Sequence, residues 1–210
     1  MDASTRERTL IGVPGVDLEP VKRPTREEAM EAVRTLIAWA GDDPRREGVI
    51  DTPKRVVDAY GDWFAGYQAD AAKELSRTFE DVQGYDDLVM LRDIEVESHC
   101  EHHMAPFLGR AYVAYMPTNS VVGISKLARV VEIYARRLQT QETMTQQIAD
   151  AICDSLKPAG VAVLIDAEHQ CMTTRGVHHR DVSTITTQFR GVFKTDADLR
   201  QRFLDFVNRK

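Results

Sequence analysis

From about residue 88 onward the apolar residues change their spacing in a fixed order, and that order excludes most folds. Alternation with a period of two predicts strands, and recurrence every three or four residues predicts helices. The predicted elements are strands at 88–97 and 108–116, helices at about 125–138 and 141–156, and strands at 161–166 and about 181–189. Strands that follow one another in pairs favour antiparallel pairing. The order therefore predicts an α+β fold and not a doubly wound parallel sheet.

The N-terminal third has a different character. Residues 1–24 carry Gly, Pro and charge without a period, and we expect them to form a flexible arm. Thr25 and Glu28 form a capping box that opens a first helix. A second helix begins at Thr52 and is expected to end at Gly66.

These patterns predict three parts of the chain. They are the arm at 1–24, a helical hairpin with its linker at 25–84, and an α+β domain at 85–210 that closes with a helix opening at Asp196. A chain of 210 residues is long enough for one such domain and a small helical appendage.

The composition limits the partners of the protein. The net charge is −6, so the surface as a whole is not suited to nucleic acid, and an anionic substrate would need a local basic pocket. No apolar run approaches the roughly 18 residues that span a bilayer, and the N-terminus lacks the pattern of a secretory signal. We expect a cytoplasmic protein without membrane or nucleic-acid partners.

Cysteine and histidine gather in two short segments. Residues 98–103 and 168–171 contain four of the six histidines and two of the three cysteines. Cys100 and His103 form a C-x-x-H pair, and Cys171 could add a third ligand from a distant strand end. Thiolate and imidazole are the ligands that zinc prefers, so a zinc site is predicted. Cys153 has no such neighbours and is expected to be an inert core residue.

The number of ligands decides what such a site can do. A closed structural site has four protein ligands, whereas three ligands plus water is the catalytic arrangement. On an extended backbone, residues i and i+2 point to the same side, so His169 could be a fourth ligand or a free base beside the metal. A structural zinc module in an interaction protein therefore stays open as an alternative.

At this point the chain resembles the GTP cyclohydrolase I family. The matching stretches are CEHHMAPFLGRAYVAYMP, VVGISKLARVVEIYARRLQTQE, TQQIADAI and AEHQCMTTRG, with DTPKRV as a looser match. The resemblance implies hydrolysis of GTP at C8 of guanine with release of formate, giving 7,8-dihydroneopterin triphosphate. It also implies the tunnelling (T-) fold, an antiparallel four-stranded sheet with two long helices on one face, and a homodecamer with active sites between subunits.

The resemblance also implies roles for individual residues. By this match the zinc ligands are Cys100, His103 and Cys171, and the catalytic histidines are His102 and His169. The residues at the guanine end are Gln141 and Glu142, and those at the triphosphate and ribose end are Ser125, Lys126, Arg129 and Arg175. Arg55 matches an arginine that reaches in from another subunit.

The chemistry of these residue types fits the implied substrate. Ser125, Lys126 and Arg129 lie on about one turn near a helix N-terminus, where backbone N–H groups also favour anions. Without the resemblance, the two cations read as a solvated helix face. Glu142 could accept hydrogen bonds from guanine N1–H and the 2-amino group, although a first-turn acid is common on helices.

Two other classes of protein fit the sequence less well. A zinc nucleobase deaminase also attacks a base with the help of a metal, but its H-x-E…P-C-x-x-C signature is absent. A T-fold relative that binds pterins or purines without chemistry would not need the complete set of metal and histidine positions. His178 and His179 are expected to be exposed loop residues.

Overall fold

The computed structural model describes residues 22–79, 85, 87–118, 120–179 and 181–209. Residues 1–21 of the predicted arm lie outside this range. The chain divides into two compact units, Met1–Ala59 and Tyr60–Lys210. Among the described residues, no helix is both long and apolar enough to cross a membrane.

The first unit contains α1 (Arg26–Trp39) and the beginning of α2 (Thr52–Trp63). The predicted capping box is confirmed: Glu28 N–H donates to Thr25 Oγ1 at 3.2 Å, and Thr25 N–H donates to Glu28 Oε2 at 2.7 Å. Helix α2 ends at Trp63, before the predicted Gly66, because Gly66 belongs to a separate 3₁₀ turn.

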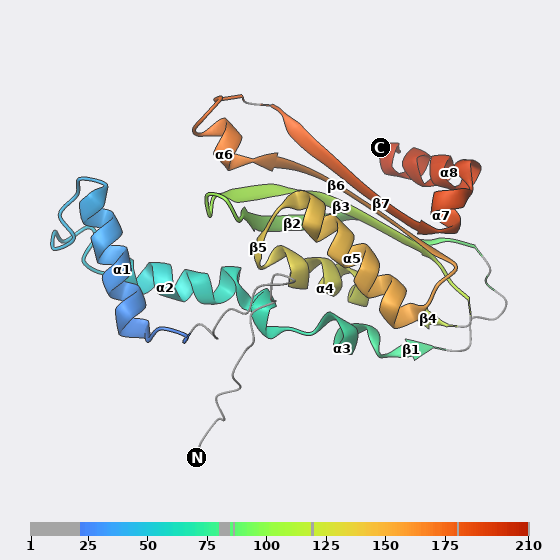
Figure 1. Cartoon of the computed structure of the whole chain (residues 1–210), viewed down its shortest axis with the longest axis horizontal. Coiled ribbons are helices and arrows are strands. Elements are labelled where there is room, and N and C mark those ends of the chain that lie inside the picture. The colour runs from blue at the N-terminus through green and yellow to red at the C-terminus, as the bar shows by residue number, and fades with distance from the viewer. Residues whose placement is uncertain (1–21, 80–84, 86, 119, 180, 210) are drawn as a thin grey trace, which may run out of the picture. The chain divides into compact units, whose positions relative to one another are not determined.

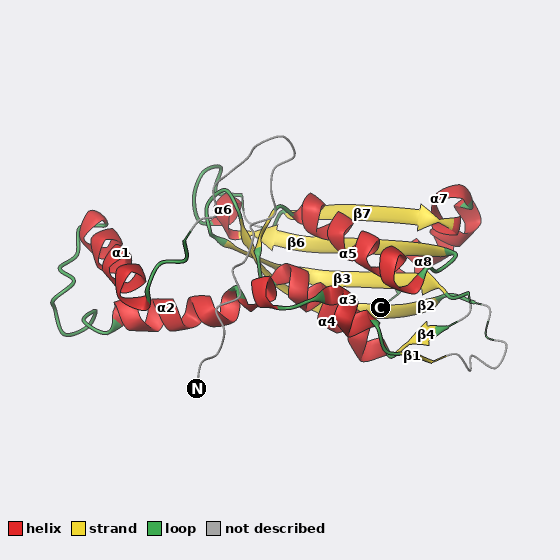
Figure 2. Cartoon of the chain, turned by 60° about the horizontal axis from the view of Figure 1, so that its bottom comes forward, coloured by secondary structure: helices red, strands yellow, loops and turns green. Residues whose placement is uncertain are grey.

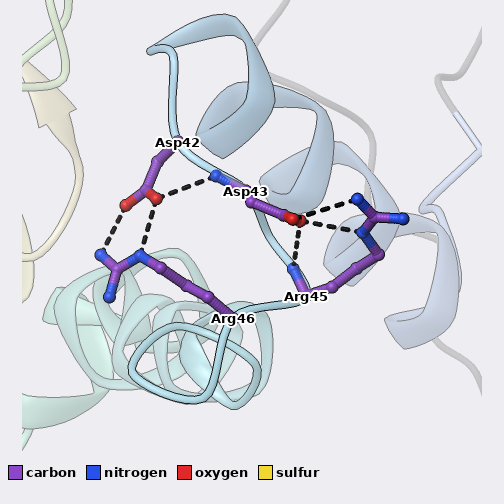
Figure 3. A network of polar contacts seen from close by, with 4 residues as sticks. All are labelled: Asp42, Asp43, Arg45 and Arg46. Atoms are coloured by element: carbon purple, nitrogen blue, oxygen red, sulfur yellow. Dashed lines mark hydrogen bonds and ion pairs between the residues drawn. The ribbon is translucent and has the colours of Figure 1, made fainter.

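Two aspartate–arginine pairs hold the loop after α1 (Figure 3). Asp42 accepts from Arg46, and Asp43 accepts from both the side chain and the backbone N–H of Arg45. Hydrogen bonds from Arg45 lower the pKa of Asp43 from 3.8 to about 2. Both carboxylates are therefore ionised at neutral pH, and the loop is a closed local network.

The second unit is built on a sheet with the strand order β5-β2-β3-β6-β7 (Figure 1). Its four long strands pair antiparallel with their neighbours; they are β2 (Val89–Cys100), β3 (Pro106–Met116), β6 (Gly160–His169) and β7 (Ser183–Gly191). The two-residue strand β5 (Leu138–Gln139) adds a parallel edge to β2. The sheet thus has one strand more than the four predicted.

Helices cover both faces of this sheet (Figures 1 and 2). Helices α4 (Ile124–Ala135) and α5 (Gln141–Leu156) pack on one face, where Leu127, Ile148 and Ile165 are fully buried. Helix α8 (Ala197–Asn208) covers part of the other face and buries Phe203 against Phe193 and Leu164. The side-chain alternation of β6 supplies both cores, since Val163 faces one and Leu164 the other.

Several short elements were not predicted. They are η1 (Ala65–Gln68), α3 (Ala71–Leu75), β1 (Thr78–Phe79), β4 (Val121–Val122), β5, α6 (Gln170–Thr173) and α7 (Val192–Thr195). Segments of two to five residues carry too few positions to show a period. The helix predicted at 125–138 stops at Ala135, because residues 138 and 139 pair with β2 instead.

Candidate active site and metal centre

A tight turn brings the first two candidate metal ligands together. Cys100 is the last residue of β2, and its N–H donates to Ala105 O at 2.8 Å. Met104 N–H donates back to Cys100 O at 2.8 Å, and Met104 itself has a positive φ of 53°. The turn sets Cys100 Sγ 4.0 Å from His103 Nδ1. The C-x-x-H spacing thus brings the two ligands together because the chain turns between them.

The third candidate ligand arrives from the far end of β6. Strands β3 and β6 pair antiparallel with Phe107 opposite His169, so the end of β6 lies beside the turn that precedes β3. Cys171 follows on the short helix α6. The ligand atoms of Cys100, His103 and Cys171 all lie within 4.8 Å of one another. The sheet register is therefore what assembles the site.

The donor set and its spacing fit a zinc ion. In tetrahedral zinc sites with bond lengths of about 2.0–2.3 Å, ligand atoms are about 3.5–3.8 Å apart, so closing this triad needs only small side-chain movements. Burial raises the pKa of the Cys171 thiol, and the adjacent Cys100 raises it further. A cation that binds both sulfurs would remove this penalty by replacing their protons.

His169 stands beside the triad and is held there by its neighbours. Its ring stacks on Phe107 with 4.6 Å between centroids and 7° between planes, and its Nε2 lies 2.8 Å from Gln141 Oε1. It is not part of the group of mutually close ligand atoms found among the described residues. The expectation that residues 169 and 171 share an extended backbone is wrong, because α6 begins at Gln170.

Gln141 fixes the protonation of this histidine. Its side chain is 1% exposed, and its Nε2 donates to the carbonyl oxygens of Ile165 at 3.0 Å and Thr184 at 2.8 Å. Carbonyls only accept, so the amide oxygen must face His169 and must accept from it. His169 therefore carries its proton on Nε2 and leaves Nδ1 as an acceptor. Burial lowers its pKa, which favours this neutral form.

His102 lies on the same turn as the ligands and differs from His169 in exposure. Its Nδ1 is 3.6 Å from Cys100 Sγ, and its Nε2 is 3.9 Å from Glu101 Oε1. The side chain is 65% exposed. Solvent can therefore exchange protons with His102 directly.

The predicted cations of α4 are already paired with an acid. Ser125 and Lys126 lie in the first turn of the helix and Arg129 in the next. Lys126 Nζ donates to Glu74 Oε2 at 2.7 Å, and Arg129 Nη1 donates to the same oxygen at 3.3 Å. Glu74 comes from α3, a helix that the sequence did not predict.

The other predicted substrate residues occupy exposed positions. Glu142 is exposed in the first turn of α5. Its negative charge raises the pKa of His169, against the larger lowering by burial. Arg175 is exposed in the segment after α6. Its positive charge lowers the pKa of the Cys171 thiol, against the larger rise caused by burial. In the first unit, Arg55 is exposed on α2 with its Nη2 3.5 Å from Asp51 Oδ2. His178 and His179 are exposed, as expected.

Sequence reasoning missed the residues that support the site. Phe107 under His169 and Glu74 beside Lys126 received no role, and neither did Trp63 and Phe64, whose rings pack 5.1 Å from the ring of His99. Such partners are 35 to 62 residues apart and share no local pattern. Only the strand register could have placed Phe107 opposite His169.

The fold and the donor set define an α+β protein with a Cys–His–Cys site suited to a divalent metal ion. The family model described as GTP cyclohydrolase I matches residues 29–208. GTP cyclohydrolase 1 from Hyphomonas neptunium is 71% identical over 98% of this chain and 97% of its own length. The chain belongs to the GTP cyclohydrolase I family of enzymes.

The chain is also similar to one further relative and, more distantly, to a solved structure. GTP cyclohydrolase 1 from Maricaulis maris is 67% identical over 89% of this chain and 91% of its own length. Among solved structures, the archaeosine synthase QueF-Like in the apo form is similar over 50% of this chain and 93% of that one, with 19% identity and a TM-score of 0.42.

Proposed function

We propose that this chain hydrolyses the imidazole ring of GTP at C8 of guanine, releases formate and forms 7,8-dihydroneopterin triphosphate. The observation that carries the proposal is the geometry at the end of β6. Three ligand atoms cluster there, and the neutral His169 lies beside them, hydrogen-bonded to Gln141. This is the arrangement of a hydrolytic metal site with an adjacent base.

Cys100, His103 and Cys171 would hold zinc, since two thiols and one imidazole suit that ion. When bound, zinc supplies a Lewis acid that makes water a stronger nucleophile near neutral pH. His169 presents Nδ1 as the proton acceptor, because Gln141 occupies its Nε2. His102, being exposed, is suited to deliver a proton from solvent to the guanine ring.

The remaining residues would bind the two ends of the substrate. Gln141 and Glu142 would serve the guanine end, the first by positioning His169 and the second through its exposed carboxylate. At the triphosphate and ribose end, a hydroxyl and three cations would bind the substrate of this acidic protein. Ser125, Lys126 and Arg129 lie on α4, and Arg175 follows α6. Arg55 would be contributed by a neighbouring subunit.

The assembly is part of the same proposal. We infer a T-fold subunit, a homodecamer with active sites between subunits, and a cytoplasmic location. In support, the sheet is antiparallel along its four long strands and carries α4 and α5 on one face.

Incubation of the zinc-loaded protein with GTP tests the proposed reaction. We expect equal amounts of formate and of a pterin that becomes fluorescent after oxidation. If neither product forms while zinc is bound, the chain does not perform this chemistry.

A further inference from the structure

The two α4 cations of the proposed phosphate subsite share one carboxylate oxygen. Lys126 Nζ lies 2.7 Å and Arg129 Nη1 lies 3.3 Å from Glu74 Oε2. The side chains of Lys126 and Glu74 are 21% and 29% exposed, so solvent screens their pairing only in part. The subsite therefore contains its own anion.

Glu74 is held firmly in this position. Asp70 caps α3 by accepting from Ala72 N–H at 2.9 Å, and the buried side chains Ala71 and Leu75 fix the helix against α4. The hydrogen bond from Lys126 lowers the pKa of Glu74, followed by that from Arg129, so this carboxyl is ionised at neutral pH.

Glu74 leaves both cations able to bind a second anion. An ammonium has three N–H donors and a guanidinium has five, whereas within the described part of the chain Lys126 and Arg129 each use one of them. A polyphosphate that takes up the free donors would lie next to the carboxylate charge. The net charge of the three side chains is +1 instead of +2, and the like charges repel.

Repulsion between the Glu74 carboxylate and a bound triphosphate would help the release of product in the proposed reaction. The triphosphate is present in substrate and product alike, so tight binding of it stabilises both equally and does not accelerate the chemical step. Excess affinity at this end would only slow the release of product.

We propose that Glu74 is a built-in counter-anion that weakens polyphosphate binding at Lys126 and Arg129 and so helps the triphosphate-bearing product to leave. The inference rests on the proposed assignment of these two cations to the triphosphate. Among the described residues, the carboxylate of Glu74 pairs with the two cations, so we assign it a positioning role and not a catalytic one.

Glu74→Gln tests the proposal, because glutamine keeps a hydrogen-bond acceptor and removes the charge. We expect the zinc-loaded protein to bind inorganic triphosphate roughly three- to tenfold more tightly at low ionic strength, as measured by calorimetry. The gain should shrink as salt is added, which a purely structural effect would not do. The KM for GTP should fall without a rise in kcat.

Glu132→Gln is the matched control. Glu132 also lies on α4 and pairs with an arginine, Arg136, at 3.0 Å, and the ion pairs among the described residues join it to neither Lys126 nor Arg129. This variant should bind triphosphate as the wild type does.

The outcomes separate the two proposals. If Lys126→Ala weakens triphosphate binding and Glu74→Gln does not strengthen it, the counter-anion is refuted and the phosphate subsite stands. If triphosphate does not bind the wild type, or binds Lys126→Ala equally well, both fail together.

Discussion

At the residue scale, the site depends on three sulfur and nitrogen atoms that converge from two distant segments. Cys100 and His103 share one turn, and Cys171 comes from the start of α6. His169 is close to them, but its ring stacks on Phe107 and its Nε2 is hydrogen-bonded to Gln141. Each of these groups has a distinct task, so single substitutions should have separable effects.

Cys171→Ser should remove the metal and reduce formate release to background while the protein stays folded. A serine hydroxyl is a much poorer zinc ligand than a thiolate. Cys153→Ser is the control, because this half-buried cysteine lies outside the triad and should keep both zinc and activity. Metal analysis measures zinc content, a formate assay measures activity, and far-UV circular dichroism shows whether the variant is folded. Full activity in Cys171→Ser would remove the metal assignment.

Gln141→Leu should lower kcat roughly 10- to 100-fold, by analogy with the loss of groups that orient metal-site residues. It should also cost about 1–3 kcal/mol of stability, since two carbonyls lose their donor. Thr145→Val controls for stability alone, because Thr145 donates to Gln141 O in the same buried network without touching His169. Equal kcat losses in both variants would mean that Gln141 is only structural.

At the element scale, close strand packing fixes the register that builds the site. A Cβ at Gly109 of β3 would overlap the carbonyl oxygen of Asp166 on β6. Gly109→Ala should therefore lower the free energy of unfolding by about 2–4 kcal/mol in denaturant titrations. Gly61→Ala on α2 should act in the opposite direction by about 0.5–1 kcal/mol, because nothing lies within 4 Å of that position. Stabilisation by Gly109→Ala would contradict the tight β3–β6 contact.

The loop after α1 should show an acid-resistant aspartate. The folded pKa of Asp43 is about 2, below its ordinary 3.8, so its ion pair stabilises the loop above pH 3.8 and is lost as pH falls toward 2. Carboxyl carbon NMR should find Asp43 still ionised at pH 4. In Arg45→Gln the midpoint of Asp43 should rise from about 2 toward 3.8, because the side-chain hydrogen bond is lost while the backbone N–H of residue 45 still donates. Arg46→Gln should leave the midpoint of Asp43 unchanged. A midpoint near 3.8 in the wild type would refute the Arg45 interaction.

The long elements could be predicted from the sequence, and the short ones could not. The capping box of α1 and the stripe of α5 are local patterns, and both were placed within a residue or two. The pairing of β5 with β2 and the helix carrying Glu74 depend on contacts with segments 39 and 52 residues away. The triad was predicted as a set of ligands because its residue types suit zinc and match the family's ligands, whereas nothing in the sequence pairs Gln141 with His169.

At the scale of the whole molecule, the proposed assembly makes a clear physical prediction. Ten copies of a 23.7 kDa chain have a mass of about 237 kDa. Sedimentation of the purified protein should show this species. Arg55→Ala should keep the mass and lose affinity for GTP if the arginine serves a neighbouring subunit. A monomer with full activity would refute active sites between subunits.

The coordination of the metal in the intact protein decides the central claim. X-ray absorption at the zinc edge should show two sulfur atoms at about 2.3 Å, one imidazole nitrogen at about 2.0 Å and one oxygen from solvent. A spectrum with two imidazoles, or with four protein ligands and no oxygen, would contradict a site open to water and would favour a structural metal.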